Sequence, residues 1–388
     1  MRAKSIAAPR AMRNGAPALA FHAASDHNGT SPTENCLSTE VRPMKLRELA
    51  LITLSWGLVW AWSVAAQAPQ DKPAAKEESA AGDAERRIEE TLGAVVRVRM
   101  RALADARSNA TLGPAREGSG IVIEPGYVLT IGYLVIEPDS IEVTTGTNRT
   151  FPATLAGYDH ASGFGLLRVP GDLGVTPLAL GDSQALVVRE PVIIIPAGGR
   201  ETASAAYVMS RRQFTGSWEY LLESAIFTAP PNRTWAGAAL VNRELKLVGV
   251  GSLIVRDTVE PGTPMPGNMF VPIDLLKPIL DELKAQGRTK ETPRPWLGLN
   301  TEVVQGRLFV TRVSPESPAE KAGLKQGDVV IGVAGAAVKT HAELYRKVWS
   351  LGAAGVEVPI KILQDGDVRD VRVKSIDRTE YFKTKPAY

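Results

Sequence analysis

The chain has 388 residues, of which 44% are hydrophobic and 22% charged, and this balance predicts folded domains with apolar cores. The length allows two or three domains. The formal net charge of +3 is carried by residues 1–68, so the rest of the chain is formally neutral. A neutral body gives no reason to expect binding to nucleic acid or to an anionic membrane surface.

An export signal is predicted near the N-terminus. Two basic residues follow Met44, an uncharged apolar run covers 49–64, and Ala-Gln-Ala stands at 66–68. This order is typical of a cleaved secretory signal peptide over 44–68, with a retained inner-membrane anchor as the alternative. Since a signal peptide begins at its methionine, residues 1–43 are interpreted as upstream sequence outside the translated protein.

Cysteine and histidine are scarce. Cys36 lies in the upstream segment, so the mature chain is predicted to have no disulfide, thiol nucleophile or thiolate metal site. Only His160 and His341 follow the signal segment, which leaves no spacing typical of metal ligands. We therefore expect neither a metal nor a cofactor. Export without cysteine fits a bacterial periplasm or cell envelope.

After the export signal, the composition alternates between linkers and β-rich segments. Residues 69–84 are rich in Ala, Pro and charged residues, which predicts a flexible linker. A short helix entering a strand is expected over 84–100. From Gly118 to Val271, short runs of β-forming residues separated by Gly, Pro, Asn and Asp favour a barrel or sandwich. An amphipathic helix with Gly287 as its stop signal closes this part.

Two folded domains are predicted from this arrangement. The larger, β-rich domain spans 85–288, and a polar, proline-containing linker over 289–295 follows it. A smaller α/β domain spans 296–378, and 379–388 form a tail.

Four segments of these domains resemble, in order, the HtrA/Deg family of periplasmic trypsin-like serine proteases with a C-terminal PDZ domain. The resemblance covers roughly 90–376. It implies a mainly β fold, in which a trypsin-like double β-barrel with a cleft between its two six-stranded barrels precedes one small α/β PDZ domain. The segments are EGSGIVIEPGYVLT (117–130), LALGDSQALVVREPVIIIP (178–196), MFVPIDLLKPILDEL (269–283) and SPESPAEKAGLKQGDVVIGVAG (314–335).

The resemblance also locates the three catalytic positions of the family. Triad hydrolysis needs a histidine base, an aspartate that orients it and a serine nucleophile. Here LTIGYLV places Tyr133 in the histidine position, DHASGFGLLRV places Gly163 in the aspartate position, and TWAGAALVN places Ala236 in the serine position. Thr234 replaces a glycine of the oxyanion loop, and Trp235 adds bulk beside it. The chain is therefore interpreted as a catalytically inactive homologue.

Other residues near these positions are given structural roles. A phenol with a pKa near ~10 is a poor base at neutral pH, so Tyr133 is expected to pack in the cleft with a local hydrogen bond. Asp159 is interpreted as a turn residue and His160 as part of a surface turn. Alternatively, Tyr133 and Trp235 contact an unfolded peptide that the cleft holds without cutting.

The PDZ unit is the best candidate binding site. WLGL at 296–299 occupies the family's carboxylate-binding loop, where backbone N–H groups hold a peptide C-terminus while the peptide adds as a strand. Thr340 and Glu343 form a capping box at the start of the groove helix. Leu344 and Val348 of that helix line the groove or belong to the core, and the sequence favours neither. His341 contacts a ligand side chain or lies on a solvated face. The predicted peptide-binding residues are Trp296, Leu297, Gly298, Leu299, His341, Leu344 and Val348.

These patterns predict an exported HtrA-like pseudoprotease that binds peptides, unfolded proteins or protein C-termini through its PDZ domain. It would act in envelope protein quality control or as a partner or regulator of an active protease. Two alternatives stay open: an active serine endopeptidase with an atypical site, and a structural subunit of an envelope complex with a closed PDZ groove. Family members form trimers, but nothing in the N-terminal segment assigns that state here.

Overall fold

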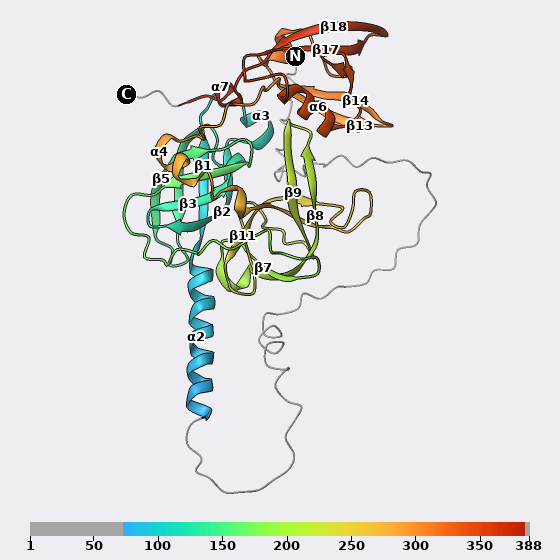
Figure 1. Ribbon diagram of the computed structural model, residues 1–388. Helices are drawn as coiled ribbons and strands as arrows, with labels where there is room; N and C mark the ends of the chain where they lie inside the picture. The colour runs from blue at the N-terminus through green and yellow to red at the C-terminus, as the bar shows by residue number, and fades with distance from the viewer. Residues whose placement is uncertain (1–72, 385–388) are drawn as a thin grey trace, which may run out of the picture.

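The computed structural model describes residues 73–384, with side chains from residue 82 onward (Figure 1). The predicted upstream extension and signal peptide lie outside the described residues. Within the described part, no helix is both long enough and apolar enough to cross a membrane.

Of the segment expected to be a flexible linker, residues 73–84 are helical instead. Helix α2, Pro73–Gly93, projects from the barrels as the long blue helix of Figure 1 and leads directly into β1. Ala, Glu, Lys and Arg are strong helix formers, and a proline is tolerated in the first turn, so the composition that suggested a linker also suits a helix. Arg200 of the second barrel pairs with Glu85 and Glu89 near the helix end.

The first barrel confirms half of the predicted double β-barrel. Its six strands close in the order β1-β2-β3-β6-β5-β4. Along β1, alternate side chains are buried, because successive residues of a strand point to opposite faces. The strands are β1 Val95–Ala102, β2 Ala115–Glu124, β3 Tyr127–Ile131, β4 Pro138–Thr144, β5 Thr150–Tyr158 and β6 Phe164–Arg168; short helices α3 Asn109–Leu112 and η2 Gly132–Leu134 lie between them.

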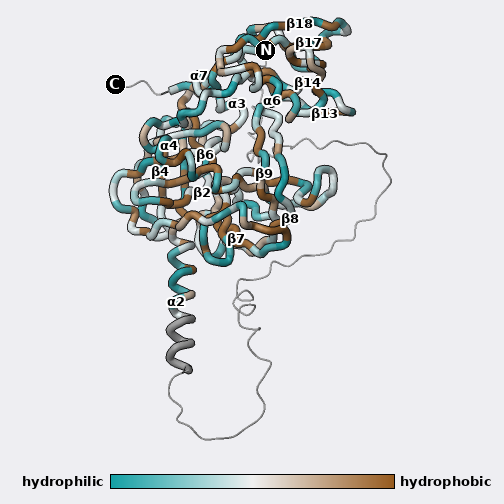
Figure 2. The backbone as a smooth tube through the Cα atoms, in the orientation of Figure 1, coloured by the Kyte–Doolittle hydropathy of each residue, from teal (hydrophilic) through white to brown (hydrophobic). Residues whose placement is uncertain are grey.

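The second barrel closes in the order β10-β11-β12-β9-β8-β7. Apolar residues gather in the strands of both barrels, drawn brown in Figure 2, and one apolar cluster runs through the two barrels. Its strands are β7 Pro191–Ile195, β8 Ser204–Gly216, β9 Tyr220–Ala229, β10 Ala239–Val241, β11 Leu247–Val255 and β12 Gly267–Pro272, with η3 Gly199–Glu201 between β7 and β8.

The helix that closes the barrels is shorter than predicted. A 3-10 turn, η4 Ile273–Leu275, is followed by α4, Leu280–Gln286. Pro278 lies between them and has no N–H for a helical hydrogen bond, which explains the interruption. Gly287 ends α4 in the left-handed conformation at φ 73°, as its position as a stop signal predicts.

The PDZ domain contains a sheet in the order β13-β14-β15-β17-β18, with β16 paired to β15. Strand β13 is therefore an edge strand, and α6 lies beside it (Figure 1). The predicted capping box is confirmed at the start of α6. The elements are β13 Leu299–Val304, β14 Arg307–Val313, α5 Pro318–Lys321, β15 Val329–Val333, β16 Ala336–Ala337, α6 His341–Trp349, β17 Glu357–Gln364 and β18 Asp367–Lys374.

Besides the linker between α4 and β13, two segments bring the PDZ domain and the barrels into contact. The long β8–β9 hairpin rises from the second barrel to α6 and β13 (Figure 1). The predicted tail is ordered through residue 384: helix α7, Arg378–Tyr381, packs back on the first barrel, where Arg107 Nη1 donates a 2.7 Å hydrogen bond to the Tyr381 carbonyl.

The capping box gives a stability prediction. Thr340→Ala removes the side chain that accepts from the Glu343 amide, so the free energy of unfolding should fall by about 1 kcal/mol in urea titration. Ser350→Ala, at the exposed other end of α6, serves as the control and should change stability by only a few tenths of a kcal/mol. If the free energy of unfolding falls equally in Thr340→Ala and Ser350→Ala, Thr340 has no capping role.

Candidate functional site

The residue in the histidine position is a hydrogen-bond donor. Tyr133 lies in η2, directly after β3, and its hydroxyl donates to the Ser252 carbonyl at 2.8 Å. Burial raises the pKa of Tyr133, so the phenol stays protonated at neutral pH. A protonated phenol whose proton is committed to a carbonyl cannot accept the proton of a nucleophile.

At the aspartate position, both the backbone conformation and the packing favour a glycine. Gly163 has φ +81°, and a Cβ added there would lie 3.1 Å from the Tyr220 hydroxyl. An aspartate would therefore be strained in both backbone and packing. Asp159 is confirmed as a turn residue, because its Oδ2 accepts from the Ser162 amide at 2.7 Å and from the Ser162 hydroxyl at 2.5 Å.

The nucleophile position lies in a loop that backbone hydrogen bonds hold in place. The Ala236 carbonyl accepts from the Ser119 amide at 2.8 Å, and the Gly237 amide donates to Gly251 O at 2.9 Å. The Thr234 amide, at the oxyanion-loop position, donates to Asn232 Oδ1 at 2.8 Å. That N–H group is therefore satisfied within the loop.

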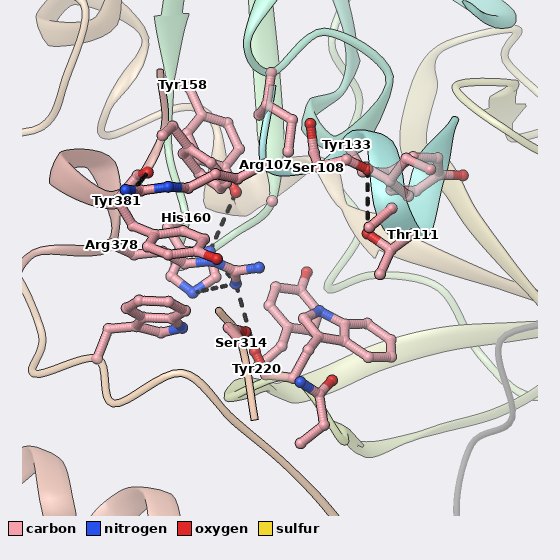
Figure 3. Close-up of a pocket in the computed structure, with 18 of the residues that line it drawn as sticks. Arg107, Ser108, Thr111, Tyr133, Tyr158, His160, Tyr220, Ser314, Arg378 and Tyr381 are labelled. Atoms are coloured by element: carbon pink, nitrogen blue, oxygen red, sulfur yellow. Dashed lines mark hydrogen bonds between the residues drawn. The ribbon is translucent and has the colours of Figure 1, made fainter. Parts of the chain in front are cut away.

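A cavity of about 160 Å³ lies beside two of these positions (Figure 3). Tyr133 and Gly163 line it, and Ala236 does not, so the three positions do not surround one open space. Among the described residues that line the cavity, three are arginines and none is an aspartate or glutamate. The PDZ domain and α7 contribute to its wall. Its charged and aromatic lining residues are Arg107, Tyr133, Tyr158, His160, Trp218, Tyr220, Trp296, Arg312, Arg378, Tyr381 and Phe382.

His160 belongs to this cavity, which corrects its assignment to a surface turn. Its ring lies near the Tyr158 hydroxyl, 3.1 Å from Nδ1, and near Arg378 Nη1, 2.8 Å from Nε2 (Figure 3). Burial, together with Arg378 and Arg294, holds the pKa of His160 well below its usual value. The imidazole is therefore neutral, as an acceptor for the guanidinium must be. Across the described residues, no group of His, Cys, Asp and Glu gathers as a metal site needs.

The PDZ loop that was predicted to bind a peptide carboxylate contacts the side chain of Glu219. Glu219, in the turn between β8 and β9, accepts hydrogen bonds from the amides of Leu297, Gly298 and Leu299 at 3.0, 2.7 and 2.9 Å. Burial raises the pKa of Glu219 to about 7, while these amides and Arg378 act in the opposite direction. Sequence reasoning did not single out Glu219, because a lone glutamate in a hairpin turn carries no local signal for a contact 78 residues away.

The rest of the hairpin tip also contacts the groove. The Thr301 amide of β13 donates to the Ser217 carbonyl at 3.1 Å. From α6, the Tyr345 hydroxyl donates to Gly216 O at 2.6 Å and accepts from the Glu219 amide at 3.2 Å. Leu221 belongs to the same apolar cluster as the PDZ core.

The other predicted groove residues are buried. Leu344 and Val348 are each 2% exposed and belong to the PDZ apolar cluster with Leu297 and Leu299. His341 is 4% exposed and its Nε2 lies 2.8 Å from the Thr301 carbonyl, so the solvated-face alternative is wrong. Trp296 is buried against Tyr381, with ring centroids 4.6 Å apart.

Comparison with known families matches both domains. A trypsin-like peptidase domain is matched over 118–250 and a PDZ domain over 295–375. Curated relatives include a probable periplasmic serine protease do/HhoA-like from Haemophilus influenzae, 31% identical over 279 residues, and the periplasmic serine endoprotease DegP of Escherichia coli, 29% identical over 276. The chain is a homologue of the HtrA/Deg proteases.

These alignments cover 66% of the chain but only 57% and 56% of the two relatives, so the chain spans little more than half their length. Among solved structures, a serine endoprotease from Yersinia pestis is 22% identical, with a TM-score of 0.45, and the match covers 76% of this chain and 97% of that one.

The buried carboxyl of this HtrA homologue gives a pH prediction. The pKa of Glu219 rises from 4.5 to about 7 in the folded chain, so the folded state binds the extra proton between these values. Its contribution to stability is therefore fully present below pH 4.5 and is lost as the pH rises through about 7. The melting temperature should fall over this range more steeply in the wild type than in Glu219→Gln, which cannot titrate. If the melting temperatures of the wild type and Glu219→Gln change with pH in parallel, the pKa of Glu219 is not raised.

Proposed function

We propose that this chain is an exported HtrA-type pseudoprotease, a protease fold that does not cleave peptides. The observation that carries the proposal is the chemistry of the triad positions. Ala236 has no nucleophilic atom, Gly163 has no side chain to orient a base, and the Tyr133 hydroxyl donates to a carbonyl. Loss of triad function reduces turnover by about 10⁶.

Two further observations support loss of activity. The residual rate of a protease without its triad depends on the oxyanion hole. Here the Thr234 amide donates to Asn232, which removes one donor from that role. The neutral His160 contacts Arg378 and Tyr158, so it has no free position from which to serve as a replacement base.

We further propose that the PDZ domain binds peptides, unfolded proteins or protein C-termini in the bacterial periplasm or cell envelope, either in protein quality control or as a partner of an active protease. Support comes from the PDZ match, from the three convergent loop amides and from relatives whose names place them in the periplasm. Three N–H groups that converge on one oxygen pair form an anion-binding concavity of the kind that holds a peptide carboxylate.

A second candidate is a structural subunit with a closed groove. The observation that favours it is the position of Glu219, which occupies the three amides that a peptide C-terminus would use. In that case the PDZ domain would bind no peptide under any condition. The two candidates share the loss of catalysis and differ in ligand binding.

Catalysis is tested with the purified full chain, incubated for a day with unfolded β-casein and separately with a fluorophosphonate probe. We expect neither fragments nor label, while trypsin in a parallel tube digests the casein. Fragments that persist through repurification and disappear with a serine-protease inhibitor would contradict the proposal and support the atypical endopeptidase.

Restoring the nucleophile alone gives a sharper test. Ala236→Ser supplies a hydroxyl, but Tyr133 cannot accept its proton and Gly163 cannot orient a base. We therefore expect the casein cleavage rate of Ala236→Ser to stay at the wild-type background. Robust digestion by this single variant would show that a base is present and would overturn the account of three lost groups.

A further inference from the structure

We infer that the tip of the β8–β9 hairpin is an intramolecular ligand of the PDZ groove, and that a peptide C-terminus enters the groove only by displacing Glu219. The second half of this inference rests on the proposed peptide-binding function. The first half rests on the contacts between the two domains alone.

The Glu219 carboxylate takes the place that a C-terminal carboxylate would take. Its two oxygens accept three backbone hydrogen bonds from the loop at 2.7–3.0 Å, and the side chain is 5% exposed. A second carboxylate would meet occupied donors and a like charge at contact distance, so the two ligands exclude each other.

The backbone of the hairpin blocks strand addition as well. A peptide that binds beside a sheet edge pairs its main chain with the edge strand, here β13. The Thr301 amide of β13 already donates to Ser217 O. Tyr345 holds the other side of the tip through Gly216 O and the Glu219 amide. The hairpin thus uses the loop, the strand and the helix of the groove together.

The docked state is displaceable rather than permanent. An intramolecular ligand acts at an effective concentration on the order of millimolar, which favours docking. Burial of the negative charge of Glu219 opposes docking. The three amide donors compensate only part of this cost, because the pKa of Glu219 stays raised. The ion pair between Glu223 and Arg346 is exposed on both sides, so solvent screens it and it holds the hairpin only weakly. A free peptide therefore competes with a contact of limited strength.

The test measures peptide binding and amide exchange on the full chain. The probe is a fluorescent peptide library with free C-terminal carboxylates and randomised final residues, together with the same library as C-terminal amides. Glu219→Ala should bind the carboxylate library at least about tenfold more tightly than the wild type, because removing the competitor raises the fraction of open grooves. The amide library should bind neither protein.

Two further variants control the result. Glu223→Ala removes another glutamate of the same hairpin. Because its ion pair is exposed, peptide affinity should change by less than about twofold. Tyr345→Phe keeps the buried ring but removes both hydrogen bonds to the hairpin, so it should also increase peptide affinity. It tests the inference independently if Glu219→Ala does not fold.

Hydrogen exchange at the amides of Leu297, Gly298 and Leu299 separates this inference from the proposed function. Faster exchange in Glu219→Ala with tighter peptide binding supports both. Faster exchange with no peptide binding in any variant supports the internal ligand and rejects PDZ–peptide recognition, leaving the closed-groove subunit. Unchanged exchange with equal peptide affinity in wild type and Glu219→Ala overturns the inference.

Discussion

One buried carboxylate joins the PDZ loop to the second barrel. A PDZ loop presents three N–H groups in one direction and has no acceptor of its own for them, so burial of the loop requires an anion or water. Glu219 supplies that acceptor from the second barrel. Strands β8 and β9 extend beyond the second barrel toward the PDZ domain (Figure 1).

The same hairpin also lines the cavity beside the triad positions. The Tyr220 hydroxyl donates to Ser162 O at 2.5 Å, in the turn that precedes Gly163, while Trp218 lines the cavity from the same turn as Glu219. From the opposite side, α7 brings Arg378 to the Trp218 carbonyl and to His160. Cationic and aromatic groups therefore surround the position where an active relative would need a carboxylate. The hairpin that contacts the PDZ loop therefore also contributes aromatic side chains to the wall of this cavity.

Sequence patterns predicted the features that depend on neighbouring residues. The short β-strands, the capping box of Thr340 and the stop signal at Gly287 follow from local composition and spacing, while the division into two barrels came from the family resemblance. The triad positions could be located because the flanking motif residues mark them, whichever residue occupies the position itself. Glu219, the site of His160 and the packing of α7 could not be predicted, since each depends on a contact between segments far apart in the chain. The misassigned linker has another cause, because alanine- and glutamate-rich composition suits a helix as well as a flexible segment.

The loop that carries Ala236 keeps its backbone frame without help from any triad side chain. The nucleophile loop is held by main-chain bonds from Ser119 and to Gly251, and none of these involves a triad side chain. Gly237 keeps a positive φ of 73°, where an added Cβ would lie 2.0 Å from Ser119 O, so the sharp turn is still enforced by packing. Replacing serine by Ala236 removes one hydroxyl from this frame and leaves its backbone bonds intact. The backbone architecture of this loop therefore does not depend on a serine at the position of Ala236.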